Sequence, residues 1–372
     1  MKFYTNIQLI GNQFLIRGYE NGQHVTHREE WKPTLFVPSR KKTKYKTLEG
    51  ESVEPIQPGF VRDCREFYKK YDEVENFKIY GNDRYVYQYI SEKYPQDRIE
   101  FDIKKIKLVT IDIEVAAEQG FPDVENVAEE LLLISLQDYA TKKVTTFGSR
   151  PFVNKDPNVT YVLCRDEVHL LSSFLAYWRK NLPEVITGWN SQMYDIPYLA
   201  GRINRVMGEK SMKDLSPWGL VSQGEVYISG RKNITYDIGG VTQLDYLDLY
   251  KRFTYTNQES YRLDYIANYE LGEKKLDHNE YDTFREFYTK DWDKFVRYNI
   301  KDVQLVDRLE DKLKLIELAV TMAFDAKVNF IDIHYQVRMW DTIIYNYLKK
   351  QDIVIPPKKR TSKSQKYAGA YV

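Results

Sequence analysis

The sequence predicts an α/β protein in which a mixed sheet is flanked by helices and joined to a β-rich α+β N-terminal domain. Three observations predict this architecture. Strand-like segments come first, strands and helices alternate after about residue 107, and a long amphipathic helix follows the alternating region. A length of 372 residues is also too great for one ordinary core, so we expect two or three domains.

The first 106 residues have the pattern of short strands and turns with helical patches. Residues 14–17 and 34–37 are strand-like and are bounded by Gly and Pro. The basic stretch 40–46 predicts a surface loop, either simply solvated or in contact with a phosphate backbone.

From about residue 107 the pattern is that of a sheet with interspersed helices. The predicted strands cover residues 108–115, 131–136, 144–147, 160–163 and 185–189. The predicted helices cover 167–180, a segment starting near 196, and a long segment from about 291 to 319. Residues 225–238 predict a β-hairpin with a basic tip at 229–233, and 355–364 an extended basic linker.

Composition excludes several classes of protein. Hydrophobic residues make up 42% and charged residues 29%, which is typical of a folded globular chain and not of a disordered or fibrous one. No apolar run approaches the roughly 18–20 residues that span a bilayer. The net charge of +1 excludes a generally basic nucleic-acid coat protein but permits a local basic groove.

Cysteine and histidine offer no metal or redox site by their spacing. The two cysteines, Cys64 and Cys164, lie far apart, which favours a reducing, intracellular compartment. The five histidines show no zinc-ligand spacing.

A first acidic motif lies in the predicted strand 108–115. Asp112 and Glu114 are two residues apart, so both carboxylates point to one face while Ile111 and Ile113 enter the core. Two neighbouring carboxylates repel unless a cation or a proton separates them. An acidic strand that faces solvent is the alternative.

A second acidic residue, Asp195, comes just before a predicted helix with Pro197 in its first turn. Asp is a favoured helix N-cap and Pro is favoured nearby, so a capping role alone would explain it.

A third acidic residue, Asp302, lies within the long predicted helix. Residues at spacings of three or four along this helix, among them Tyr298, Asp302 and Leu305, form a stripe that faces the core. A buried Asp is costly unless it is hydrogen-bonded, paired or bound to a metal, and a buried Asp–Lys pair is one alternative. Tyr298 lies one turn before Asp302 on the same face.

Together these segments predict a cleft of hard oxygen ligands. Such ligands select Mg²⁺ or Mn²⁺, and two ions about 4 Å apart would activate water and stabilise a leaving 3′ oxygen. Asp245 and Asp248 are rival carboxylates, but nothing near them in the sequence supports a ligand role.

In this order, the segments resemble the exonuclease motifs of B-family DNA polymerases, especially those of T-even-type phages. The motifs are Asp112-Ile113-Glu114, then Asn190 with Tyr194-Asp195, then Tyr298 to Asp302. The resemblance covers essentially the whole chain. It implies an RNase H-like 3′→5′ exonuclease domain at 107–314, with 1–106 and the returning segment 315–372 forming the N-terminal domain and a linker.

The resemblance also implies roles for single residues. Asp112, Glu114 and Asp302 would hold one ion, Asp195 would hold a second that Asp112 shares, and Tyr298 would orient the attacking water. Phe121, Asn190 and Tyr194 are expected to contact DNA, as are Arg231 and Lys232 in the hairpin, which resembles one that hands a frayed primer to the exonuclease site.

The expected partners are single-stranded or primer-template DNA and a polymerase half, present in cis or as a separate subunit. The segment Tyr367-Ala368-Gly369-Ala370 is similar to the element that joins the two halves, whereas no Ser-Leu-Tyr-Pro or Asp-Thr-Asp-Ser segment follows. The expected location is the cytoplasm of a phage-infected cell. Two alternatives remain open, an RNA-directed exonuclease on the same fold, and a nucleic-acid-binding or partner-docking fragment without independent activity.

Overall fold

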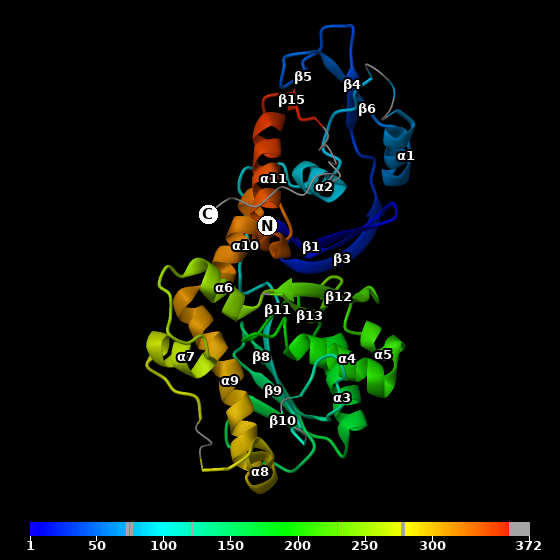
Figure 1. Cartoon of the computed structure of the whole chain (residues 1–372). Helices are drawn as coiled ribbons and strands as arrows, with labels where there is room; N and C mark the ends of the chain where they lie inside the picture. Colours follow the sequence, from blue (N-terminus) through cyan, green and yellow to red (C-terminus); the bar gives the residue numbers. More distant parts are fainter. Residues whose placement is uncertain are drawn as a thin grey trace.

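The computed structural model describes residues 1–71, 74, 77–118, 120, 122–228, 230–276 and 280–356, with only the backbone described at 228 and 231. The molecule is elongated and has two parts, which meet along β1 and β3 on one side and β12 and β13 on the other (Figure 1). Within the described residues, no helix has the length and apolar character needed to cross a membrane.

The upper part in Figure 1 is built mainly from short sheets, with helices packed beside them. One antiparallel sheet has the order β1-β2-β3, β4 pairs antiparallel with β6, and β5 pairs parallel with β15. Its elements include β1 (Lys2–Ile10), β2 (Gln13–Glu20), β3 (Gln23–Glu30), β4 (Leu35–Pro38), β5 (Lys46–Thr47), β6 (Val53–Ile56), α1 (Val61–Tyr71), α2 (Tyr85–Lys93) and β15 (Ile353–Val354). The predicted β-rich character of residues 1–106 is confirmed.

The lower part contains a six-stranded mixed sheet of order β10-β9-β8-β7-β11-β14. The strands are β7 (Leu108–Val115), β8 (Leu131–Asp138), β9 (Val144–Gly148), β10 (Val159–Leu163), β11 (Val185–Thr187) and β14 (Thr242–Gln243). β7 is antiparallel to β8 and parallel to β11, and β11 is parallel to β14. The predicted mixed sheet is therefore confirmed, with β7 near its centre.

Helices cover both faces of this sheet (Figure 1). They are α3 (Glu167–Lys180), α4 (Asp195–Met207), α5 (Glu209–Lys213), α6 (Tyr246–Phe253), α7 (Leu263–Leu271), α8 (Phe284–Lys290) and α9 (Trp292–Leu313). Ile111 and Ile113 of β7 are buried in one core with residues of α3 and α4. Because side chains alternate along a strand, Asp112 and Glu114 point to the other face, which α9 covers.

The long helix predicted from about 291 to 319 is interrupted, which corrects that prediction. α9 ends at Leu313, Lys314 adopts a left-handed φ of 54°, and α10 (Leu315–Ala326) begins immediately after it. The buried Glu310 accepts hydrogen bonds from the backbone N–H groups of Ile316 (3.0 Å) and Glu317 (3.1 Å), so it satisfies the exposed amides at the start of α10.

The hairpin is longer than predicted, and its tip is different. β12 (Val221–Ile228) and β13 (Arg231–Ile238) pair along eight positions, with Ile228 opposite Arg231. Gly230, which directly precedes β13, has a φ of 77°. The predicted basic tip at 229–233 is therefore wrong, because Arg231 and Lys232 belong to a strand.

After α9 the chain returns to the upper part. α10, the 3₁₀ helix η1 (Phe330–His334) and α11 (Gln336–Lys349) follow one another. Residues of α10 share a core with Phe3, Tyr4 and Ile7 of β1. The Tyr4 hydroxyl also donates to the carbonyl of Val328 at 2.7 Å, so the two distant stretches of chain pack as one unit.

A buried carboxylate joins the upper sheet to the lower one. Glu184, just before β11, is 1% exposed and accepts hydrogen bonds from the hydroxyls of Thr5 and Tyr19, both at 2.9 Å. The guanidinium of Arg17 donates to the carbonyls of Pro183 (2.8 Å) and Gly240 (2.6 Å). These bonds fix β1 and β2 against the end of the mixed sheet.

Candidate metal centre

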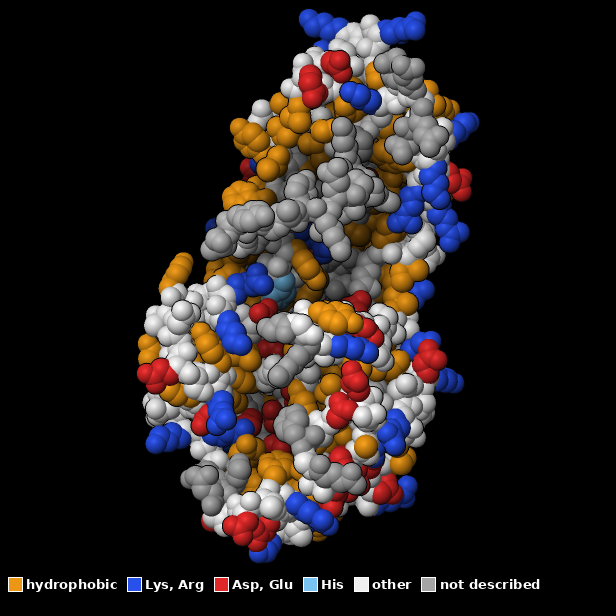
Figure 2. Space-filling model, viewed as in Figure 1, with side chains coloured by type: hydrophobic (Ala, Val, Ile, Leu, Met, Phe, Trp, Pro, Cys, Tyr) orange, Lys and Arg blue, Asp and Glu red, His pale blue; other side chains and the backbone are white. Residues whose placement is uncertain are grey.

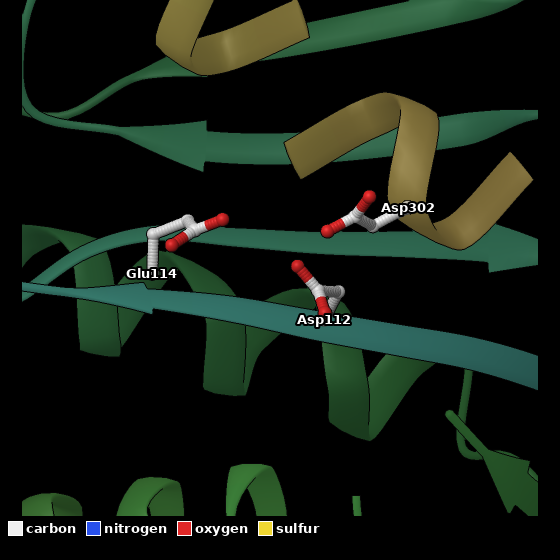
Figure 3. A group of neighbouring side chains, drawn as sticks. All are labelled: Asp112, Glu114 and Asp302. Atoms are coloured by element: carbon white, nitrogen blue, oxygen red, sulfur yellow. The ribbon is translucent and has the colours of Figure 1, made fainter. Parts of the chain in front are cut away.

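Three carboxylates from two elements converge above the centre of the mixed sheet. Asp112 and Glu114 extend from β7, and Asp302 extends from the facing side of α9 (Figure 3). One oxygen from each lies within 4.8 Å of the others. The alternative of a solvent-facing acidic strand does not hold, since α9 covers these residues and leaves Glu114 only 8% exposed.

The electrostatics of the group require a cation or protons. Burial, and then the charges of Asp302, Asp195 and Glu114, raise the pKa of Asp112 well above its usual range. Burial also raises the pKa of Glu114 to about 8 and the pKa of Asp302 to about 6, although Lys275 opposes both shifts. Each carboxyl group therefore favours its neutral form unless a positive charge lies close by.

The donor set fits a hard divalent cation. Among the described residues, the buried Oδ1 of Asp302 has no hydrogen-bond partner, and no histidine or cysteine belongs to the group. Oxygen-only ligands suit Mg²⁺ and Mn²⁺ better than zinc. The structure brings three of the four predicted ligands, Asp112, Glu114 and Asp302, into one carboxylate cluster. Their role as metal ligands stays a prediction, and so do the number and identity of the ions.

Asp195 lies beside this group without joining its tightest cluster. It is 4% exposed at the start of α4, and its Oδ1 accepts the backbone N–H of Ile113 at 3.0 Å. No side chain caps α4, so the capping alternative is not what the structure shows. Burial raises the pKa of Asp195 to about 7, with contributions from Asp245 and Asp302. Asp195, Asp112, Glu114 and Asp302 line one cavity of about 750 Å³.

Lys275 is a functional candidate that the sequence did not single out. Its Nζ lies 2.5 Å from Oδ2 of Asp302 and 4.1 Å from the ring centroid of Tyr298. Burial lowers the pKa of Lys275, but Asp302, Tyr298 and Asp112 raise it more, so the side chain is a cation. The buried Asp–Lys pair left open by the sequence therefore exists, together with the carboxylate cluster. The signal was Asp302 itself, because a buried carboxylate needs a positive partner.

Asn299 is a second residue missed from sequence. It is fully buried on α9, and its Nδ2 donates to Oδ2 of Asp112 at 2.5 Å. It lies three residues before Asp302 and four after Phe295, so it falls on the predicted core-facing stripe. A polar residue on an apolar stripe was the available signal.

The segment around Asn190 borders the same cavity. Asn190 is exposed and has a left-handed φ of 66°, and Tyr194 is half-buried. Asp245, the rival carboxylate, is absent from the tight group and instead accepts backbone N–H groups of this segment. Asp248 pairs with His334 at 3.0 Å. The structure gives these two residues no ligand role.

Three predicted DNA contacts receive less support. Phe121 lies outside the described residues, and so does the side chain of Arg231. Lys232 is exposed on β13, with its Nζ 2.9 Å from Glu225 and 3.8 Å from Glu125. In the space-filling view, acidic side chains gather within the hollow of the lower part, and basic ones lie mainly around it (Figure 2).

Comparisons with known proteins relate the chain to DNA polymerases. Residues 69–266, more than half of the chain, match the profile described as "DNA polymerase family B, exonuclease domain". The whole chain aligns with the DNA-directed DNA polymerases of Escherichia phage RB69 at 31% identity and Enterobacteria phage T4 at 29% identity. A DNA polymerase of Bombyx mori nuclear polyhedrosis virus is 28% identical over 44% of the chain and 16% of the viral protein. The chain spans 44% of the length of each phage relative.

Proposed function

Because the chain belongs to DNA polymerase family B and contains its exonuclease domain, we propose that it performs the proofreading reaction. The proposed reaction is hydrolytic removal of mononucleotides from single-stranded or mismatched DNA 3′ ends. The observation that carries the proposal is the convergence of Asp112, Glu114 and Asp302 within 4.8 Å in a cavity large enough for a nucleotide.

We assign the carboxylates to two Mg²⁺ or Mn²⁺ ions. Asp112, Glu114 and Asp302 would hold one, and Asp195 would hold a second that Asp112 shares. When bound, such ions supply an activated water and stabilise the leaving 3′ oxygen. A phosphodiester carries negative charge, so four uncompensated carboxylates would repel it. The ions are therefore an electrostatic requirement of the reaction.

The remaining residues would prepare the site for the substrate. The hydroxyl of Tyr298 would orient the attacking water, and Lys275 would offset part of the charge on Asp302. Asn299 would keep the Asp112 carboxylate in one orientation through its 2.5 Å hydrogen bond. Asn190 and Tyr194, which line the cavity, would contact the 3′-terminal nucleotides. Contacts to the backbone and base stacking imply weak sequence preference.

The wider assignments belong to the same proposal. The lower part would be an RNase H-like domain at 107–314, with 1–106 and 315–372 forming the N-terminal unit and a linker. The linker element at 367–370 lies outside the described residues. Since the phage relatives are more than twice as long, a polymerase half would accompany this chain in cis or as a separate subunit. Their phage origin supports a location in the cytoplasm of an infected bacterium.

A nuclease assay tests the proposal directly. A 5′-labelled single-stranded DNA should shorten stepwise from its 3′ end with Mg²⁺ and remain intact with EDTA. The Asp112→Ala/Glu114→Ala double variant should lose this activity. The matched control, Glu49→Ala with Glu51→Ala, removes two exposed acidic residues with the same spacing and should keep it. Wild-type turnover by the first variant would refute the site assignment.

The same substrates distinguish the alternatives. An RNA oligonucleotide of the same sequence should be degraded more slowly than the DNA, and the opposite ranking would indicate an RNA-directed exonuclease. Oligonucleotide binding without any metal-dependent hydrolysis would indicate a binding fragment that needs the polymerase half.

A further inference from the structure

We propose that Asp245 is a positioning residue for nucleic-acid binding, because its carboxylate holds the turn at 190–192 so that Asn190 faces the cleft. This inference rests on the proposed exonuclease function and deepens it. Asp245 lies outside the carboxylate cluster, and its effect on the substrate would be transmitted by Asn190.

The sheet brings Asp245 next to this turn. β11 and β14 are parallel neighbours, and the segments that leave them stay paired. The backbone N–H of Leu244 donates to Ile186 and that of Tyr246 donates to Gly188, both at 2.9 Å. Asp245 lies between these two bonds, directly beside the residues that follow Gly188.

The Asp245 carboxylate accepts three backbone hydrogen bonds. Its Oδ1 accepts from Leu247 at 2.9 Å, which caps α6, and from Asn190 at 3.1 Å. Its Oδ2 accepts from Gln192 at 2.9 Å. A helix cap requires only one acceptor oxygen, which Asn or Ser also supplies. The bond from Gln192 to Oδ2 therefore goes beyond what the helix cap requires, and it holds the turn.

Asp245 is a buried carboxylate that is bound by backbone N–H groups and not, within the described part of the chain, by a cationic side chain. It is 4% exposed, and no described Lys, Arg or His side chain forms a salt bridge with it. A buried carboxylate without a cationic partner is costly unless N–H groups solvate it. The two N–H groups of the turn thus stabilise the carboxylate, and the carboxylate in return fixes the turn.

The turn needs such an anchor because of the conformation of Asn190. A φ of 66° is unfavourable for most L-residues, and Asn is among those that tolerate it best. The carbonyl of Asn190 also accepts from Met193 and Tyr194, both at 3.1 Å, so its peptide groups are held on both sides. Its exposed side chain borders the 750 Å³ cavity and an adjoining one of about 1000 Å³, both of which include Asp112 and Asp302.

Two substitutions of Asp245 distinguish its role as the N-cap of α6 from its role in holding the turn at 190–192. Asp245→Asn keeps an acceptor for the α6 cap but places an amide N–H₂ opposite the N–H of Gln192. Asp245→Ser also caps the helix, but its side chain is too short to serve both sides of the turn. Asn190→Gly is the reference variant, because it removes the amide side chain while tolerating the positive φ.

The experiment measures kcat and KM on a 5′-labelled single-stranded DNA with Mg²⁺, together with the melting temperature of each variant. We expect Asp245→Asn and Asp245→Ser to raise KM about tenfold, as for loss of one hydrogen bond to a charged group, and to change kcat by less than about threefold. In the Asn190→Gly background, Asp245→Asn should raise KM by less than about threefold, because both changes act through the same side chain.

Binding provides a readout that does not depend on hydrolysis. The Kd of a fluorescent oligonucleotide, measured with the Asp112→Ala/Glu114→Ala variant, should rise about tenfold when Asp245→Asn is added. Failure of the wild type to hydrolyse DNA would overturn the proposed function, and this binding measurement would still test Asp245. An unaltered KM and Kd in both Asp245 variants, a loss in kcat alone, or equal effects with and without the Asn190 side chain would overturn the inference.

Discussion

Replacing Glu114 by Gln should stabilise the metal-free protein while abolishing hydrolysis. Burial raises the pKa of Glu114 from 4.5 to about 8, with Asp302 and Asp195 adding to the rise and Lys275 opposing it. A carboxyl group with a raised folded-state pKa stabilises the fold fully below its unfolded pKa. That stability is lost as the pH rises through the folded-state value. The loss therefore develops between about pH 4.5 and pH 8.

The pKa shift of Glu114 determines how much the free energy of unfolding changes with pH. For a carboxyl group whose pKa rises from 4.5 to about 8, the free energy of unfolding at pH 7 is roughly 3 kcal/mol lower than at pH 4. Gln cannot ionise and has nearly the same shape. Glu114→Gln should therefore raise the free energy of unfolding of the metal-free protein by roughly 3–4 kcal/mol at pH 7–8, and by less than about 0.5 kcal/mol at pH 4.5.

Urea unfolding followed by circular dichroism, in EDTA at several pH values, measures this difference. Glu66→Gln, on the exposed surface of α1, is the matched control and should behave as wild type. Mg²⁺ should narrow this difference, because a cation at 100 times its Kd contributes about 2.7 kcal/mol to the protein that binds it. A Glu114→Gln variant no more stable than wild type at pH 8, or equally stabilised at pH 4.5 and pH 8, would refute the reasoning.

Three further perturbations test other contacts. Asn299→Leu removes the buried hydrogen-bond donor to Asp112. The free energy of unfolding, measured in urea, should fall by about 1–3 kcal/mol, and single-turnover assays should show slower hydrolysis. Unchanged values in both measurements would contradict this expectation. Lys275→Met removes the cation beside Asp302 and should raise the pKa of Asp302, so the pH–rate profile should shift to higher pH, and a shift to lower pH would contradict it. Glu184→Ala should cost about 3–5 kcal/mol at pH 7. Burial raises the pKa of Glu184, but His24 and Arg17 lower it more, so this stabilisation is present above the unfolded pKa and is lost as the pH falls through the folded value. An unfolding difference that persists undiminished at pH 3 would contradict that account.

Local patterns predicted the elements that carry the carboxylates. The alternation around Asp112 and Glu114 depends only on the two-residue period of a strand, and the structure places β7 at residues 108–115 as predicted. Asp302 was recognised because a charged residue on an apolar helical stripe must be buried with a partner. Both inferences use short-range periodicity, which the sequence displays directly.

Tertiary contacts decided what the sequence could not show. Lys275 lies between α7 and α8 in an irregular segment without periodicity, so only the folded chain reveals its approach to Asp302. The break at Lys314 has neither Gly nor Pro nearby, and it depends on Glu310 binding the amides of α10. Asp245 was considered a rival ligand because the sequence shows that it is a carboxylate. The sequence does not show that this carboxylate binds backbone N–H groups.

Metal binding tests the central claim most directly. Calorimetric titration of the metal-free protein with Mn²⁺ should detect binding in the wild type and lose it in the Asp112→Ala/Glu114→Ala variant, with Asp302→Asn also weakened. Equal Mn²⁺ affinity and stoichiometry in wild type and the double variant would show that the carboxylates on β7 and α9 do not form the metal centre.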